Sequence, residues 1–115
     1  MSVDPTYFRM ERLSLLEFYA SPTEQLEWQL QTPTLDSGEI CCWWLDHIYL
    51  DDPVWGEAFS PDELRLIRDF NVAIKSAFSP YDRNFPKIEV LLREPAWKRV
   101  IAAAATAATR VRSAT

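Results

Sequence analysis

Glycine is scarce in this sequence, with two residues among 115, and that scarcity disfavours a fold built on tight β-hairpins. Long apolar runs are missing as well, because the longest, 40–45 and 100–105, fall far short of the roughly 20 residues of a membrane-spanning helix. The N-terminus lacks the basic and apolar regions of a signal peptide. We therefore expect a cytoplasmic protein without a membrane span.

Cysteine and histidine are too few for a disulfide framework or a metal centre. Cys41 and Cys42 are adjacent, so their side chains diverge on a helix and could be joined only through a strained turn. A zinc site takes about four Cys, His or carboxylate ligands, and His47 is the sole histidine. The sequence predicts two buried, reduced thiols, no metal and no cofactor.

Sequence motifs of catalysis and of nucleic-acid binding are also missing. The chain has no glycine-rich phosphate loop, no nucleophile elbow and no dinucleotide fingerprint. Its basic residues are scattered over 64–112 rather than gathered on one recognition helix. We therefore expect neither an enzyme nor a nucleic-acid-binding protein. An enzyme that uses His47 with Asp51 or Asp52 is an alternative, but further converging groups are lacking.

Apolar residues are plentiful, and local signals mark where helices begin. Hydrophobic residues make up 48% of the chain and aromatic residues 13%, enough for a single domain over 1–115 to bury a core. In 21–24 and 60–63 a Ser is followed by Pro and then by Glu three residues after the Ser, the pattern of a capping box with a proline start. The segment 36–39 places acids at both ends in the same geometry. Three helix starts are thus predicted.

Hydrophobic periodicity extends these starts into helices. In 61–78 the apolar positions from Leu66 to Phe78 fall on one face, opposite Arg65 and Arg68. The alanine-rich segment 95–111 also has a single apolar stripe. The first helix is less regular, because its leucines at 13, 15 and 16 do not form one narrow stripe.

We expect an all-α fold, a compact bundle of about five helices. Their predicted ranges are 8–20, 22–31, 37–49, 61–78 and 95–111. The segments 51–59 and 79–86 are expected to be connections, and 87–92 a short helix or an extended lead-in.

Charge is divided unevenly along the chain. Residues 1–63 hold 13 acids and 2 bases, a net charge of −11, while 64–115 hold 4 acids and 10 bases, a net charge of +6. The two halves can neutralise each other within one chain or in a homodimer, through bases such as Arg65, Arg68, Lys98 and Arg99. Alternatively, the acidic half stays exposed and attracts a basic protein partner while repelling nucleic acid and anionic lipid.

The acidic stretch 43–57 combines carboxylates with tryptophan. Trp43 and Trp55 are not assigned to a core stripe, and tryptophan dominates the energetics of many protein interfaces. Asp51 and Asp52 are expected at the end of a helix, where they oppose its dipole, although ordinary turn chemistry also explains them. The residues expected on one exposed partner-binding patch are Trp43, Asp46, His47, Asp51, Asp52, Trp55 and Glu57.

Three segments carry a resemblance to known proteins: Trp43-Trp44-Leu45-Asp46, Phe59-Ser60-Pro61-Asp62-Glu63-Leu64 and Asp69-Phe70-Asn71. They resemble segments of short acidic bacterial proteins, among them immunity partners of secreted antibacterial toxins. With the acidic half and the aromatics, this favours a non-enzymatic protein-binding module, an immunity or antitoxin-like protein that occludes a basic toxin domain. The alternative is a small homo-oligomeric scaffold or subunit without a toxin partner.

Overall fold

The computed structural model describes residues 4–45 and 51–115, and every regular element in those ranges is an α-helix. The helices are α1 (Pro5–Tyr19), α2 (Pro22–Gln31), α3 (Gly38–Leu45), α4 (Val54–Ala58), α5 (Pro61–Phe78), α6 (Ile88–Leu91) and α7 (Pro95–Ser113). The predicted all-α class is confirmed. The described part holds seven helices rather than about five, because α4 lies in a segment predicted as a connection and α6 is the short helix left open for 87–92.

Each of the three predicted start segments begins a helix, but among the described residues the reciprocal capping box is complete only at Ser60. At the start of α3, Asp36 Oδ1 accepts from the Gly38 amide at 2.9 Å. Ser21 Oγ accepts a hydrogen bond from the Glu24 amide at 3.2 Å at the start of α2. Ser60 forms the full capping box of α5, in which its Oγ accepts from the Glu63 amide at 3.3 Å and its own amide donates to Glu63 at 2.8 Å. Asp52 also precedes a helix, because its carboxylate accepts from the Val54 amide at 3.0 Å at the beginning of α4. The end of the predicted helix 37–49, after which Asp51 and Asp52 were expected, lies outside the described residues.

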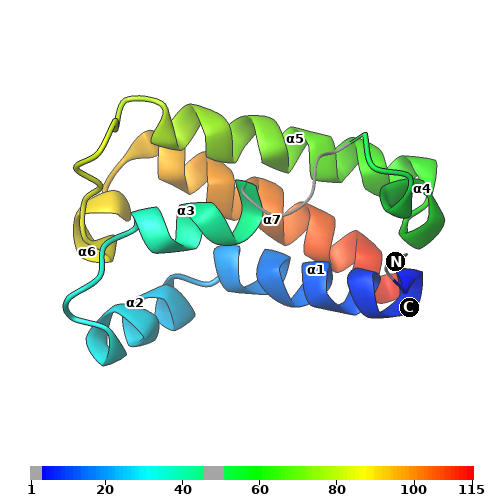
Figure 1. The fold of residues 1–115 in the computed structure, drawn as a ribbon, viewed down its shortest axis with the longest axis horizontal. Coiled ribbons are helices and arrows are strands. Elements are labelled where there is room, and N and C mark those ends of the chain that lie inside the picture. The colour runs from blue at the N-terminus through cyan, green and yellow to red at the C-terminus, as the bar shows by residue number, and fades with distance from the viewer. Residues whose placement is uncertain (1–3, 46–50) are drawn as a thin grey trace.

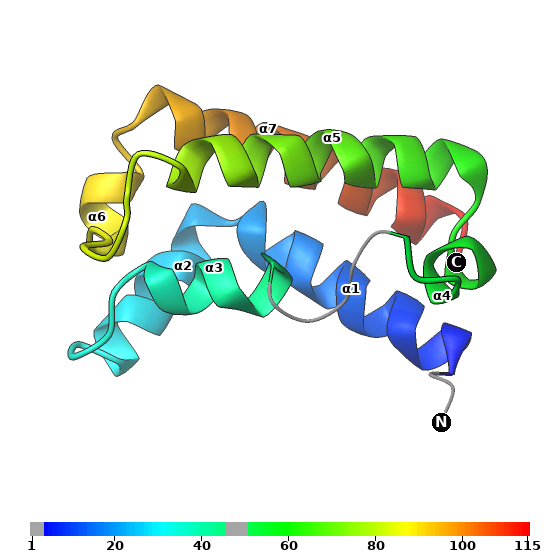
Figure 2. The same cartoon turned by 45° about the horizontal axis from the view of Figure 1, so that its top comes forward.

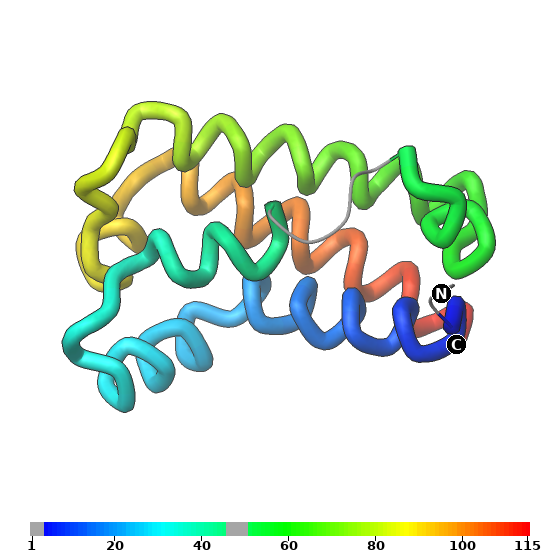
Figure 3. The backbone as a smooth tube through the Cα atoms, in the orientation of Figure 1, coloured from blue at the N-terminus to red at the C-terminus, as the bar shows by residue number. Residues whose placement is uncertain are grey.

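Three long helices form the body of the molecule. Figure 1 shows α5 and α7 running antiparallel, with α1 on the other side of α7. The beginning of α1 and the end of α7 lie at the same end of the molecule (Figure 3). Figure 2 shows α2 and α3 near the C-terminal end of α1, whereas α4 lies near its N-terminal end. The second half of α1 therefore has α3 beside it.

One hydrophobic core draws side chains from all seven helices, with α2 contributing through the half-buried Trp28. The stripes predicted for α5 and α7 point into it, and Phe70 and Trp97 are completely buried. Tyr19 lies at the centre, with its ring centroid 5.3 Å from that of Phe70, and its hydroxyl donates to the Ile40 carbonyl of α3. Burial raises the pKa of the Tyr19 hydroxyl far above its usual range, so it stays protonated.

Two buried glutamines join α2 to the rest of the fold. Gln25 donates to the Phe18 and Tyr19 carbonyls at 3.1 and 3.0 Å and accepts from the Trp97 indole at 2.9 Å. Gln29 accepts from the Ile88 amide at 3.0 Å, which links α2 to α6. Since each buried polar atom of Gln25 has a partner, these side chains orient α2 without the usual desolvation penalty.

The cysteine prediction needs one correction. Cys41 is half-buried, but Cys42 is exposed, because the buried face of the short helix α3 is formed by Ile40 and Trp44. Within the described residues, no helix has both the length and the apolar character needed to cross a lipid bilayer.

Candidate functional site

A groove of about 480 Å³ follows the outer face of α1 and reaches α3. The described residues that line it are Tyr7, Met10, Glu11, Ser14, Leu15 and Phe18 of α1 and Trp43 of α3. The six positions on α1 repeat at intervals of three and one, which places them on one face of the helix over about three turns. The groove is therefore a continuous helical stripe.

The groove exists because α1 is apolar on two sides. One side carries the fully buried Phe8, Leu16 and Tyr19 into the core. The other carries the groove, where Tyr7 is 66% exposed and Met10 61% exposed. Exposed apolar side chains that adjoin one another in a groove, rather than scattered singly, mark a surface for binding.

Trp43 forms the wall of the groove at its α3 end. Its ring centroid lies 5.2 Å from that of Phe18 and 5.5 Å from that of Trp28, and the indole is half-buried. The second ring contact is T-shaped, so Trp28 of α2 supports the indole from behind. The groove wall is therefore the partly exposed indole of Trp43, which Trp28 holds in place.

The charge around the groove is negative. Glu11 lines it directly, and Glu39 lies one turn before Trp43 on α3. Asp4 is the N-cap of α1, three residues before Tyr7, where its carboxylate accepts from the Thr6 amide at 2.9 Å; all three acids are exposed. The first half of the chain has two bases, Arg9 and Arg12. Arg9 pairs with Glu63 and Arg12 pairs with Glu11 from beneath the surface, so among the described residues neither base pairs with Asp4 or Glu39.

Arg12 is buried beneath Glu11. The guanidinium is 2% exposed and lies within 5.2 to 5.8 Å of the ring centroids of Phe8, Trp44 and Trp55. Its Nη2 approaches Glu11 at 3.3 Å, while Nε and Nη1 have no hydrogen-bond partner among the described residues. Burial lowers the pKa of Arg12, and the Glu11 charge opposes that effect. The Glu11 carboxylate of the groove therefore lies next to a buried guanidinium that three aromatic rings surround.

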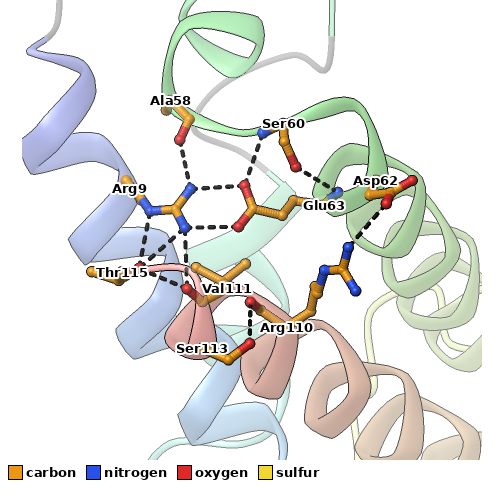
Figure 4. A network of polar contacts seen from close by, with 9 residues as sticks. All are labelled: Arg9, Ala58, Ser60, Asp62, Glu63, Arg110, Val111, Ser113 and Thr115. Carbon is orange, nitrogen blue, oxygen red and sulfur yellow. Dashed lines mark hydrogen bonds and ion pairs between the residues drawn. The ribbon is translucent and has the colours of Figure 1, made fainter.

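A polar network around Arg9 joins α1 to α5 and to the end of α7 (Figure 4). Arg9 forms a two-point ion pair with Glu63 at the start of α5, and its guanidinium also donates to the carbonyls of Ala58 and Val111 at 2.9 and 3.1 Å. A further bond reaches Thr115 Oγ1 at 3.2 Å. One side chain of α1 thus contacts the segment before α5 and the end of α7, which sets the rotation of α1 about its axis.

The two halves of the chain are partly paired with each other. Arg110 contacts Asp62 at 2.9 Å, and Arg112 contacts Glu17. Both pairs are exposed, so each adds little stability. The sequence suggested other bases for such pairing, namely Arg65, Arg68, Lys98 and Arg99. Among the described residues, none of these four bases forms an ion pair.

The predicted patch is not brought together as expected. Trp43 lines the groove, but Trp55 is 3% exposed, and its expected place on an exposed surface is wrong. Its ring packs against Phe8 at 4.8 Å and stacks on Phe59 at 5.8 Å, because α4 folds the 51–59 segment onto α1.

Three of the acids of the predicted patch can be located in the structure. Asp51, Asp52 and Glu57 are exposed around α4, and Asp52 is engaged at the beginning of that helix. Asp46 and His47 lie outside the described residues.

The groove residues on α1 were not predicted from the sequence, although a signal for them was there. The leucines at 13, 15 and 16 do not fit one stripe because α1 is apolar on two sides. For the enzyme alternative, the described residues bring together no group of three or more His, Cys, Asp or Glu that could hold a metal ion. Comparisons with known protein families, curated proteins and solved structures find no match to this chain.

Proposed function

We propose that this chain is a protein-binding module that receives an apolar segment of a cationic protein in the groove between α1 and α3. The observation that carries the proposal is the exposure of Tyr7 and Met10 on a helix whose opposite face is core. Trp43 supplies an aromatic anchor at the end of the same surface. Buried aromatic anchors with a charged rim are the usual source of affinity and of specificity in protein interfaces.

The proposed biological role is neutralisation of a basic toxin domain, as in immunity and antitoxin proteins. The excess of acids in 1–63 supports it, because a cationic partner would be steered toward this half over long range. The described part of the groove lining supports binding rather than chemistry, since the ionisable side chains in it are Glu11 and Tyr7. The position of the partner's segment then decides whether the partner's own active site is covered.

A photo-crosslinking experiment tests this function. The photoreactive residue p-benzoylphenylalanine replaces Met10 in one variant and Val72 in another, and each is expressed in the native host. Val72 is a matched control because it is 65% exposed on α5, away from the groove. We expect an adduct with a protein of basic isoelectric point from position 10 and none from position 72.

Three outcomes contradict the proposal. Equal adducts from both positions, or none from position 10, would mean that the groove does not select a partner. An adduct of the chain with itself from position 10 would support the homo-oligomeric alternative instead. The variant Met10→Ser provides a second check, because it should abolish the adduct made from a photoreactive residue at Ser14, whereas Val72→Ser should not.

A further inference from the structure

We infer that the bound segment is a basic amphipathic α-helix that lies along α1 and places a Lys or Arg against Glu11. This inference rests on the proposed function and adds the form of the segment and the residue that selects it. Four features of the groove carry it: its length, its backbone, its apolar floor and the single carboxylate at its centre.

The length of the groove matches a short helix. From Tyr7 to Phe18 the stripe covers eleven residue steps, about 16 Å at the helical rise of about 1.5 Å per residue. A docked helix of about three turns would set its own i, i+3, i+4 and i+7 positions against this stripe. Ser14 is the one small side chain in the stripe, and it allows a neighbouring helix to approach closely near the midpoint.

The backbone of the groove argues against an extended segment. Strand addition requires an unpaired sheet edge, which supplies main-chain hydrogen bonds to the incoming chain. The described residues contain no strand, and the amides and carbonyls along α1 bond within the helix. An extended peptide would leave its own polar backbone over Met10 and Leu15 without partners, at a cost that a helix avoids.

The floor of the groove favours a helix over a proline-rich segment. Proline-rich ligands dock in slots lined by aromatic rings. Here the aromatic groups lie at the two ends, with Tyr7 at one end and Phe18 with Trp43 at the other. The middle is formed by Met10, Ser14 and Leu15, and methionine is a common and adaptable contact for helices in grooves.

Charge selects a basic helix and disfavours a second copy of this chain. Glu11 lies near the middle of the stripe, so a two-fold pairing of two α1 helices would bring two Glu11 side chains close together. A Lys or Arg in the same place would be attracted. Glu11 can accept it because its side chain is 43% exposed and Arg12 reaches one of its oxygens. Arg12 acts here as a positioning residue that holds the carboxylate over the groove.

Designed peptides test the form of the segment. The first peptide has Leu at helical i, i+3, i+4 and i+7 positions and Lys elsewhere, and the second has the same composition without the period. The third has Glu in place of Lys, and the fourth is a proline-rich peptide of PxxP type. Binding to the full chain is measured by nuclear magnetic resonance, which also locates the contact from shifts of Met10 and of the Trp43 indole.

We expect the first peptide to bind at least tenfold more tightly than the others, to become helical, and to shift groove signals. Glu11→Gln and Glu39→Gln should each weaken it roughly threefold to tenfold, a typical effect of one charge on a docking equilibrium. Glu89→Gln is the matched control and should leave affinity unchanged, because Glu89 is exposed on α6 and does not line the groove. Circular dichroism of each variant confirms that it is folded. Equal binding of the scrambled, acidic or proline-rich peptide would overturn the inference.

The crosslinked partner separates failure of this inference from failure of the proposed function. Mass spectrometry of the adduct from position 10 identifies the partner segment that touches the groove. A basic segment with a helical apolar period supports the inference. A segment of another kind would support the proposed binding function but contradict the inference that the segment is a basic amphipathic helix. The absence of any adduct would contradict both.

Discussion

Arg9 and Glu63 lie 54 positions apart and are joined by two hydrogen bonds, Nη1 to Oε1 at 2.8 Å and Nη2 to Oε2 at 2.7 Å. The same Glu63 carboxylate accepts from the Ser60 amide and so completes the capping box of α5. Its side chain is 3% exposed. One buried carboxylate therefore both begins α5 and holds α1 in place, and the position of the groove depends on it.

Replacing Glu63 by Gln should lower the free energy of unfolding by about 2 kcal/mol, because the half-buried Arg9 then keeps its position without a counter-charge. Gln retains the size of the side chain and can still accept from Ser60, so the loss reports the ion pair. Urea denaturation measures it. Asp62→Asn is the matched control: it breaks the exposed pair with Arg110 and should change stability by less than about 0.5 kcal/mol. Equal effects of the two variants would contradict this account.

The same pair predicts a loss of stability in acid. The hydrogen bond from Arg9 holds the pKa of Glu63 below its ordinary value, with the Ser60 amide adding to the effect. An unfolded Glu titrates near about 4.3, so between the two pKa values the unfolded state binds more protons. The stabilisation is therefore complete above that value and is lost as the pH falls through the folded pKa. Urea denaturation at several pH values should give a shallower acid loss for Glu63→Gln than for the parent chain.

The helices that the sequence predicted well are those whose start is determined by residues close together in the sequence. Ser21 and Ser60 begin α2 and α5 as expected, because a cap and the next turn lie within four residues of each other. The burial of Trp55 could not be predicted in this way. It depends on contacts with Phe8, 47 positions earlier in the sequence, and on a short helix, α4, that has no strong start signal.

The candidate site shows the same limit. Trp43 was expected to bind a partner and does line the groove, but among the described residues its neighbours there come from α1 rather than from 51–57. The irregular leucine pattern of α1 was visible in the sequence. The pattern alone does not say that α1 has two apolar faces and that one of them stays exposed. Which face is exposed depends on how α3 and α4 cover the helix. Such coverage is set by tertiary packing, which a helical period does not encode.

Removing the cap of α5 should cost measurable stability. In Ser60→Ala the Glu63 amide loses its side-chain acceptor, and we expect a loss of about 1 kcal/mol. Ser60→Thr keeps a hydroxyl and should recover most of it. Thermal unfolding followed by circular dichroism measures both variants. An alanine variant as stable as the parent would show that the hydroxyl does not cap α5 in solution.

The two cysteines should react at different rates with a thiol reagent. Cys42 is exposed, whereas Cys41 is half-buried, so we expect Cys42 to be modified roughly tenfold faster in the folded protein. Labelling of Cys41→Ser and Cys42→Ser, followed by mass spectrometry, assigns the fast and slow thiols. A fast phase that survives in Cys42→Ser would contradict the assignment.

Arg12 should be dispensable for stability. Desolvation of its guanidinium and two donors without partners in the described structure oppose folding, while the three surrounding rings and Glu11 favour it. Apolar replacements of similar size at buried ionic sites are often neutral or stabilising. We therefore expect Arg12→Met to unfold in urea with a free energy equal to the parent's or up to about 2 kcal/mol higher.

The comparison with Arg12→Ala makes this result interpretable. Alanine leaves a cavity between Phe8, Trp44 and Trp55 and should cost about 3 kcal/mol, which shows that the site is packed. If the methionine variant is as stable as the parent while the basic helical peptide binds it more weakly, then the buried cation serves the groove by holding Glu11. A loss of more than about 2 kcal/mol in Arg12→Met would instead mean that attraction between the cation and the rings outweighs desolvation, and that Arg12 is a stabilising part of the core.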